Sequence, residues 1–328
     1  MDNTVFAGIT GRIRSMETKL LGMPKLESLS DASDFEGCIE MLKGTRYDKY
    51  INMPSYDEGL KIAVQDLYKE MHKMSPAREV VDIMAVKYDA HNIKCLIKGR
   101  LSDLNVENIL IDAGTIPVPD LMRIKDEKNF KGIPNILARR MRESVKVYKK
   151  THISNDIDVN IDRGTFEYMM EISKKSGMKY LTEYTSLIID VTNIMSFIRL
   201  KAVGDELATF EKMFIQGGNI GYDIFSPFFG QSLDKFASKI FYTGYYKWAN
   251  AISEYMKAND IGYLEKFRDD YIMDFIKKAR YVSLGPQIVI AYIAAVENEI
   301  RMLRIILTGK KNNVKPESIK KRLRDVYV

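Results

Sequence analysis

Residues 86–100 read VKYDAHNIKCLIKGR, and the spacing of their apolar side chains decides the fold class. Ile93 and Leu96 belong to a run with the three-and-four spacing of a helix face that packs on a core. Asp89 and Asn92 lie seven and four residues before Leu96, so they fall on that same face. Because a charge on a packed face is costly unless it is paired, we predict a specific partner for Asp89.

The same polar spacing returns further along the chain. Residues 188–201 read IIDVTNIMSFIRLK, where Asp190 and Asn193 repeat the first pair at an offset of 101 residues. A weaker copy, ENEIRMLRIILTGK at 297–310, places Glu299 where the first copy has its asparagine. There the acid, Glu297, is one place out of register. Each acid is expected to meet a Lys or Arg of a neighbouring helix, or a helix N-terminus. The predicted polar seam, with a structural role, comprises Asp89, Asn92, Asp190, Asn193, Glu299 and Arg301.

A second repeated marker supports the same period. TRYDKY at 45–50 resembles TGYYKW at 243–248, and Tyr148 stands at the 101-residue offset from Tyr47. Repetition at this length predicts three related helical bundles, each within the usual size of a domain. Chance similarity between amphipathic helices is the alternative. The predicted units are 1–105, 106–212 and 213–328.

The rest of the chain has helical periodicity almost throughout, so we predict an all-α fold. No alternating run is long enough to predict a strand, and HISNDIDVNID at 152–162 is expected to form a loop because of its Asn and Asp content. The predicted helices are 56–74, 77–101, 133–151, 160–176, 180–202, 229–258, 260–279 and 286–308.

Composition describes an ordinary soluble chain. The 328 residues are 46% hydrophobic and 29% charged, and the net charge of +6 is mild for this length. Two cysteines, Cys38 and Cys95, form no disulfide framework and are expected to be ordinary core residues of a reducing compartment. The N-terminus lacks the apolar core of a signal peptide, and the longest apolar run, 286–296, is about half of a membrane span. We expect a chain that neither spans a membrane nor is exported.

Motifs for catalysis are absent from the sequence. There is no GxxxxGK[ST], and IQGGNIGYDI at 215–224 is better explained as a connector than as a phosphate loop. The histidines, His72, His91 and His152, form no metal-ligand pair, and His91 is expected on a solvated helix face. Cys95 shows no nucleophile motif and no histidine partner in sequence. We therefore predict no catalytic, cofactor-binding or metal-binding residues.

Basic and aromatic residues offer candidate contacts with partners. A basic stripe on the helix at 135–150 and a basic C-terminal segment are most simply solvated faces, but they could also bind an acidic subunit, anionic headgroups or nucleic acid. Phenylalanines near Pro227 are most simply core residues, and otherwise an apolar lip for a partner. Arg12 and Arg14 could pair with Asp89 or Asp190 or face a partner. The candidate partner-binding residues are Arg12, Arg14, Arg139, Arg142, Lys146, Phe228 and Phe229.

Four stretches of the sequence, in their order along the chain, resemble those of one known family. They are YDAHNIKCLIKGR at 88–100, GPQIVIAYIAAVENEIRMLRIILTGK at 285–310, the ending RLRDVYV at 322–328, and GRIRSMETKLL at 11–21. Together they resemble the C subunit of the V-type ATP synthase, called A-type in archaea, which is equivalent to the d subunit of the vacuolar ATPase. None of the four is a catalytic fingerprint, so the resemblance depends on their order and spacing.

The resemblance implies an all-helical funnel of three similar domains in pseudo-threefold arrangement. It implies a non-catalytic, peripheral rotor subunit at the cytoplasmic face of the membrane. There it would be a socket between the D and F subunits of the central stalk and the membrane rotor ring, linking ATP synthesis or hydrolysis to proton or sodium transport. No cofactor, small-molecule substrate or nucleic acid is implied. The alternatives are a helical scaffold that binds nucleic acid through basic helix faces, and an enzyme with spatially assembled carboxylates.

Overall fold

The computed structural model describes residues 2–53, 55–124 and 130–328, and every regular element within them is a helix. The predicted all-α class is therefore confirmed. The chain forms two compact units: unit 1 comprises Met1–Ala85, Ile111–Thr115 and Asp269–Val328, and unit 2 comprises Val86–Leu110 and Ile116–Arg268. The division falls within two helices, α6 (Arg78–Leu101) and α15 (Ile261–Lys277). The boundaries of the three sequence repeats, and their threefold arrangement, stay predictions.

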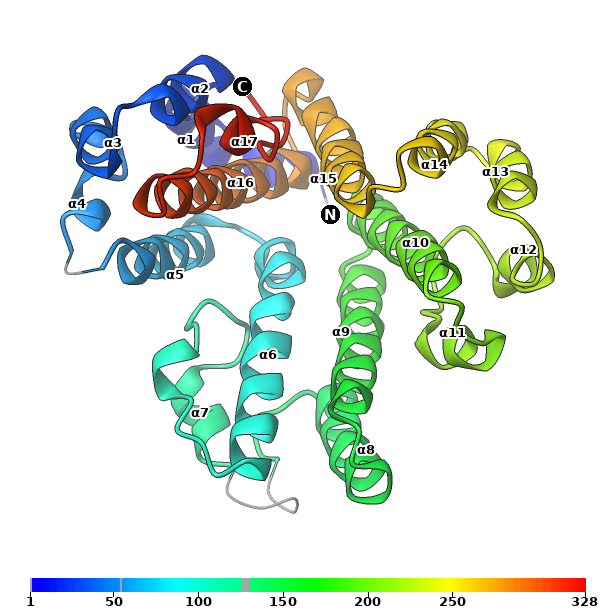
Figure 1. Ribbon diagram of the computed structural model, residues 1–328. Helices are drawn as coiled ribbons and strands as arrows, with labels where there is room; N and C mark the ends of the chain where they lie inside the picture. The colour runs from blue at the N-terminus through cyan, green and yellow to red at the C-terminus, as the bar shows by residue number, and fades with distance from the viewer. Residues whose placement is uncertain (1, 54, 125–129) are drawn as a thin grey trace. The chain divides into compact units, whose positions relative to one another are not determined.

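Helix α16 (Pro286–Lys311) is the centre of unit 1 (Figure 1). It packs against α1 (Ala7–Glu17), α2 (Met23–Asp31), α3 (Phe35–Leu42) and α5 (Tyr56–Met74). Because neighbours cover it on several sides, its residues from Ile288 to Val296 are buried almost all round. Pro286 occupies the first turn, as the sequence predicts. The other elements of unit 1 are η1 (Asn3–Phe6), α4 (Asp48–Ile51), η4 (Lys278–Tyr281) and α17 (Pro316–Lys320).

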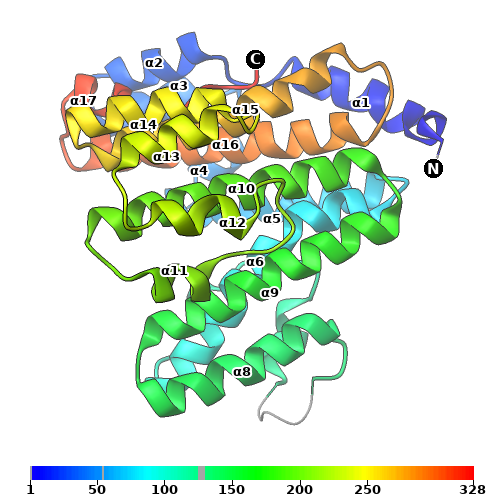
Figure 2. The same cartoon turned by 90° about the vertical axis from the view of Figure 1, so that its right-hand side faces the viewer.

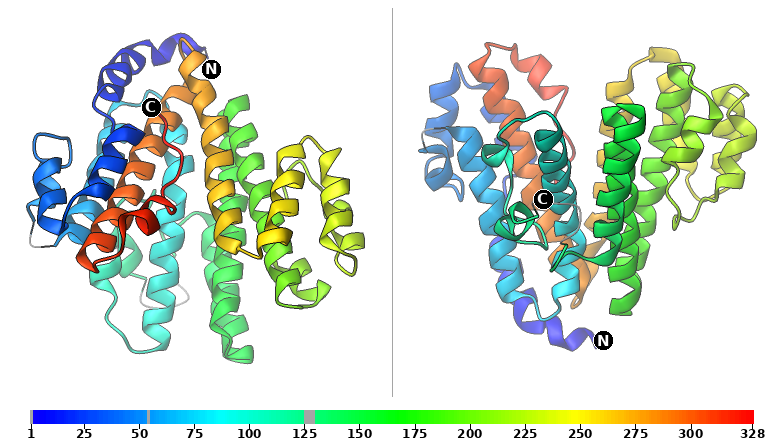
Figure 3. Two further views of the ribbon diagram at one scale, coloured as in Figure 1. Left: turned by 45° about the horizontal axis from the view of Figure 1, so that its top comes forward. Right: turned by 90° about the horizontal axis from the view of Figure 1, so that it is seen from below.

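In unit 2, α8 (Asn135–Thr151) and α9 (Ser154–Ser176) form a helical hairpin, and α10 (Lys179–Ala202) packs on α9 (Figure 2). Ile93 of α6 joins a core with Leu137 of α8 and Ile157 of α9. Helices α13 (Leu233–Phe241) and α14 (Tyr246–Ala258) run side by side (yellow in Figure 3). The other elements are η2 (Glu107–Ile109), α7 (Val118–Met122), α11 (Leu207–Met213), α12 (Tyr222–Phe225) and η3 (Ser226–Phe228).

Two predictions about local structure are wrong. The segment 152–162 is not a loop: α9 begins at Ser154, because Ile157 and Ile161 are both buried four residues apart. Core packing thus outweighs the turn preference of the Asn and Asp residues. The predicted helix 229–258 is two helices: α13 ends at Phe241, and Gly244 adopts a φ of +86° in the turn that leads to the second helix.

Candidate functional site

Each of the three long helices α6, α10 and α16 holds one buried carboxylate. Asp89 and Asp190 are 0% exposed and Glu299 is 2% exposed. Each carboxylate accepts a hydrogen bond from the backbone N–H of an apolar loop residue, and that residue lies two positions before a short helix. We call this arrangement, a buried carboxylate bound to the backbone of a loop, a carboxylate clasp. The donors are Ile116 for Asp89 (3.0 Å), Ile220 for Asp190 (3.0 Å) and Leu21 for Glu299.

Asp190 accepts four hydrogen bonds in its clasp. Its Oδ1 accepts from Ile220 N, and its Oδ2 accepts from the backbone N of Asn219 at 2.8 Å, from Asn219 Nδ2 at 2.9 Å and from the Tyr245 hydroxyl at 2.5 Å. All of these donors are neutral, so Asp190 binds neither a Lys nor an Arg; its two backbone donors lie just before α12, close to the helix N-terminus that was the predicted alternative. Amide and hydroxyl groups can satisfy a carboxylate without the burial of a second charge.

The glycine-rich segment 215–224 wraps around this carboxylate. Gly217 has a φ of +106°, and a Cβ on Gly218 would lie 2.1 Å from Asp190 Oδ1. At its start, Ile215 N donates to Asn193 Oδ1 at 3.0 Å and Asn193 Nδ2 donates to Ile215 O at 2.8 Å. The glycines therefore let the backbone approach an internal anion, the aspartate of α10.

Glu299 occupies the corresponding clasp of unit 1. Its second oxygen accepts from the Tyr47 hydroxyl at 2.6 Å, and burial raises the pKa of Glu299 to about 7. The sequence repeat predicts Glu299 at the asparagine position and Glu297 as the acid. In the structure Glu299 has the acid's partners, and Glu297 instead accepts from the Tyr68 hydroxyl at 2.8 Å.

The tyrosines of the second repeated marker are the hydroxyl donors of two clasps. Tyr47 and Tyr245 each follow a threonine whose hydroxyl donates to the carbonyl three residues earlier at 2.6 Å. Tyr148, the middle member of the marker, packs half-buried against the core of unit 2. Both patterns are visible in the sequence, but only the structure shows that the acid and the tyrosine are partners.

The other residues of the predicted seam have different surroundings. Asn92, which lies three residues after Asp89 in the chain, is fully buried. Arg301 lies at the surface of unit 1, where its guanidinium binds Asp269 at 2.9 Å. Asp269 also accepts from Arg324 at 3.0 Å, so this part of the seam is an ion-pair cluster.

The helix face with His91, predicted to be solvated, is partly exposed and carries ion pairs. Lys94 and Lys98 of this face bind Asp162 at 2.5 Å and Asp158 at 2.7 Å, both on α9. The sequence shows no histidine partner for Cys95, and the structure supplies one: Cys95 Sγ lies 3.7 Å from His91 Nε2, one helical turn away. Burial raises the pKa of the Cys95 thiol, which disfavours the thiolate that a nucleophile needs.

One ionisable pair, His72 and Asp82, is not predicted by the sequence patterns. His72 at the end of α5 and Asp82 in α6 lie 3.6 Å apart, because the turn at Ser75 brings the two helices together. Burial raises the pKa of Asp82 to about 6 and lowers the pKa of His72. Arg78 binds the same carboxylate at 3.2 Å. His72, Arg78 and Asp82 form an ion-pair network where the two helices meet. In the sequence, the only sign of it is a turn signal with a His before it and an Asp after it.

The two N-terminal arginines differ in their surroundings. Arg14 binds Glu17 at 2.8 Å and donates to the carbonyl oxygens of Ala279 and Val282, both at 3.0 Å. It is therefore engaged within unit 1. Arg12 is exposed and forms no ion pair with any described residue.

The basic face of α8 is partly neutralised. Arg139 binds Glu167 at 2.8 Å, and the Arg142 guanidinium lies 4.8 Å from the centre of the Phe130 ring. Lys146 is exposed. A helix face whose basic side chains are already paired within the protein has fewer cations available to bind phosphate groups. The structure therefore supports the nucleic-acid-binding alternative less than the sequence alone does.

The two phenylalanines near Pro227 are also distinct. Phe229 is 9% exposed and packs edge-on against Phe197 in an aromatic core. Phe228 is half-buried and lies at the edge of the same cluster, near Phe236. Of the two, only Phe228 offers appreciable surface. The role of both residues in partner binding stays a prediction.

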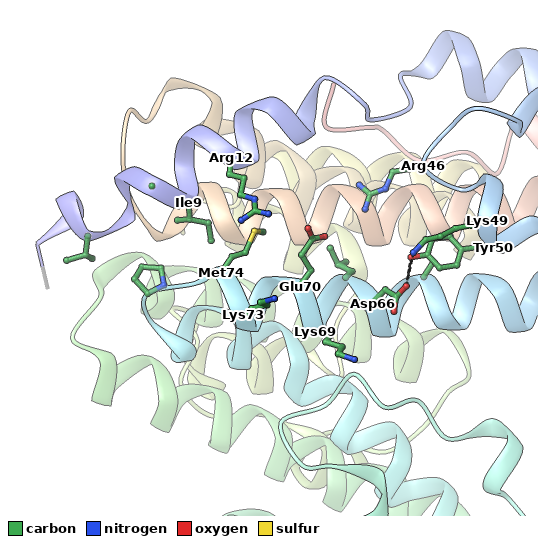
Figure 4. A pocket seen from close by; sticks show the side chains of 15 residues that line it. Ile9, Arg12, Arg46, Lys49, Tyr50, Asp66, Lys69, Glu70, Lys73 and Met74 are labelled. Atoms are coloured by element: carbon green, nitrogen blue, oxygen red, sulfur yellow. Dashed lines mark hydrogen bonds and ion pairs between the residues drawn. The ribbon is translucent and has the colours of Figure 1, made fainter.

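A groove of about 870 Å³ lies between α1 and α5 of unit 1 (Figure 4). Apolar side chains such as Ile9, Leu67 and Met74 form part of its lining. Its charged residues are mainly cationic, since five basic side chains face two carboxylates. They are Arg12, Arg46, Lys49, Lys69 and Lys73, with Asp66 and Glu70.

Most of the groove's positive charge is uncompensated. Lys49 binds Asp66 at 3.0 Å, and Arg46 donates to the Tyr292 hydroxyl at 2.7 Å. Arg12, Lys69 and Lys73 form no ion pair within the described part of the chain. We therefore regard the groove as the best candidate site for contact with an acidic group.

Among the described residues no group of His, Cys, Asp and Glu is arranged to hold a metal ion. Within the same residues, no helix combines the length and the hydrophobicity that crossing a membrane requires.

Comparison with known proteins adds the identity of the family. The sequence profile described as "ATP synthase (C/AC39) subunit" matches residues 9–322. The C subunit of the V-type sodium ATPase of Enterococcus hirae is 24% identical over 318 residues, which cover 96% of this chain and 97% of that protein. The C subunit of the A-type ATP synthase of Methanocaldococcus jannaschii is 26% identical over 355 residues, covering 98% and 87%. The similarity extends over most of the length of both relatives, and the chain belongs to the ATP synthase C/AC39 subunit family.

Proposed function

We propose that this protein is the socket of a rotary ATPase. In that role it joins the D and F subunits of the central stalk to the membrane rotor ring at the cytoplasmic face, without a catalytic site of its own. Rotation through it then links ATP synthesis or hydrolysis to the transport of protons or sodium ions. The family match over residues 9–322 is the observation that carries the proposal.

The carboxylate clasps suit a part that transmits torque. One ion that crosses the membrane delivers about 2.3 kcal/mol per 100 mV, so the helices must keep their register under repeated load. A clasp joins a long helix to a loop through a buried, directional network, and sliding of the helix would strand the carboxylate. Asp190 illustrates this, because three residues of unit 2 donate to it.

The groove between α1 and α5 is the surface that we propose for an acidic partner within the complex. Arg12, Lys69 and Lys73 are exposed and without ion pairs in the described residues, while the groove's apolar lining can cover carbon atoms of the partner. Such an arrangement favours an amphipathic segment that carries Asp or Glu.

Capture experiments test both statements. The purified chain is mixed with the D and F subunits, and separately with the detergent-solubilised ring, and we expect it to retain both. Recovery of neither by the folded protein would overturn the proposed function.

The variant R12E/K73E reverses two groove cations and is expected to weaken one of these associations about tenfold, with stronger effects at low salt. The variant K174E/K315E makes the same change in charge at exposed lysines that do not line the groove and serves as its control. Equal affinities of the two variants would remove the groove from the proposal.

A further inference from the structure

Three aromatic side chains cluster on the surface turn between α13 and α14. Phe241 is 49% exposed, Tyr242 is 86% exposed and Tyr246 is 51% exposed. The centre of the Phe241 ring lies 5.4 Å from that of Tyr242 and 6.4 Å from that of Tyr246. We call these three residues the aromatic tip. Single exposed aromatic residues are common, but three in contact form a patch that usually marks an interaction.

The turn below the tip is held firmly. Ile240 and Trp248 are fully buried, and the Thr243 hydroxyl donates to Ile240 O at 2.6 Å. Tyr245, between the exposed aromatics, points inward and donates to Asp190 in its clasp. The tip therefore presents its rings from a rigid base, which lowers the entropy cost of binding.

The fold itself does not require aromatic residues at these positions. The repeated marker places the same turn at residues 42–50, where Thr45 donates to Leu42 O at 2.6 Å and Tyr47 donates to Glu299. In that turn the positions of the tip residues carry other side chains. Lys43 stands for Phe241, Gly44 for Tyr242 and Asp48 for Tyr246. One copy of the motif is polar and the other is aromatic, although both perform the same structural task.

The charges beside the tip indicate what it binds. Lys235 and Lys239 are exposed on α13, together with one exposed acid, Asp234, and Lys247 directly follows Tyr246. No arginine occurs between residues 200 and 267. Protein interfaces favour aromatic residues together with Arg and are poor in Lys. Basic residues beside Tyr and Phe also occur in segments that rest on anionic lipid surfaces, where Lys is not depleted.

We propose that the aromatic tip inserts its rings into the headgroup region of an anionic membrane, with the neighbouring lysines near the lipid phosphates. Tyr242 and Tyr246 carry an apolar ring and a polar hydroxyl, a combination that suits this boundary. Three rings and three lysines give only a weak and reversible attachment. The inference goes beyond the proposed function and does not rest on it.

Vesicle sedimentation tests this inference. The probes are vesicles of phosphatidylcholine alone and of phosphatidylcholine mixed with phosphatidylglycerol. The intact chain should bind the mixed vesicles, and added salt should weaken the binding. The variant F241K/Y242G/Y246D copies the residues of the other turn and leaves the net charge unchanged, and it should bind roughly tenfold more weakly. The variant K235Q/K239Q keeps the rings and should lose only the preference for phosphatidylglycerol.

Two controls separate the outcomes. Y263A removes a single exposed ring on α15 of the same unit, 39% exposed, and should bind as the unchanged chain does. The triple variant should still be captured by the D and F subunits and by the ring. Equal vesicle binding by the chain and the triple variant, or no binding by either, would overturn the inference. Loss of that capture in the triple variant would assign the tip to a protein partner instead.

Discussion

Glu299→Gln is the sharpest test of the carboxylate clasp in unit 1. The carboxyl group is 2% exposed, and its burial raises the pKa from 4.5 to about 7. Glutamine is nearly the same size and resembles the protonated acid, because it can still accept from Leu21 N and can donate to the Tyr47 hydroxyl oxygen. The substitution therefore removes the titration while it keeps most of the clasp.

The direction and size of the effect follow from linkage. Between pH 4.5 and about 7 the folded protein keeps a proton on Glu299 that the unfolded chain has released. The stability that this group contributes is therefore fully present below pH 4.5 and is lost as the pH rises through about 7. The pKa difference corresponds to a loss of about 3 kcal/mol over that range. E299Q should lack this loss, so its stability relative to the unchanged protein should rise with pH.

Native-state hydrogen exchange of the α16 amides measures the free energy of opening in the surroundings of Glu299. Measurements at acidic, neutral and mildly alkaline pH should diverge for the two proteins and reach their largest difference above neutrality. Asp82 also has a raised pKa, about 6, so D82N should remove a separate part of the same pH dependence. Parallel profiles for E299Q and the unchanged protein would refute the assignment of a protonated, buried Glu299.

Further substitutions test the clasps of unit 2. Asp190→Ala should lower the free energy of unfolding by about 1–3 kcal/mol, since it leaves the Tyr245 hydroxyl and the loop amides without their acceptor. Asp89→Ala should have an effect of the same order, and unchanged thermal midpoints in both variants would contradict a structural role. Gly218→Ala should cost about 1–3 kcal/mol, because its Cβ would collide with the Asp190 carboxylate, while Gly230→Ala, which has open space around it, should be nearly neutral in the same melting experiment.

The parts of the fold that depend on nearest neighbours were predictable. Helix α5 spans the predicted 56–74, because its apolar spacing is continuous and its ends are marked by residues that do not extend it. The all-α class follows from the same local periodicity. The loop prediction for 152–162 was wrong because the Asn and Asp residues of this segment favour turns. The burial of Ile157 and Ile161 in the core outweighs that preference.

The candidate site was predictable in its parts but not in its connections. The repeat identifies Asp89 and Asp190 as unusual, since a carboxylate on an apolar helix face needs a partner. It does not say that the partners are backbone amides, because every residue except proline carries an N–H group and the sequence does not mark which one is turned inward. The pattern therefore predicts a Lys, an Arg or a helix N-terminus as the partner, and it does not single out the neutral donors just before α12 that Asp190 has.

The sequence alone determined that this chain is helical, that it contains repeated polar positions and that it resembles the C subunit of a rotary ATPase. Those properties depend only on the order and spacing of the residues. Only the tertiary structure decided that Glu299 lies beside Tyr47, 252 residues away along the chain, and that Arg12 faces α5 across a basic groove. Such contacts depend on which loop packs over which helix. The packing of the whole unit decides this, because the helix propensity of each segment is the same whether or not the contacts form.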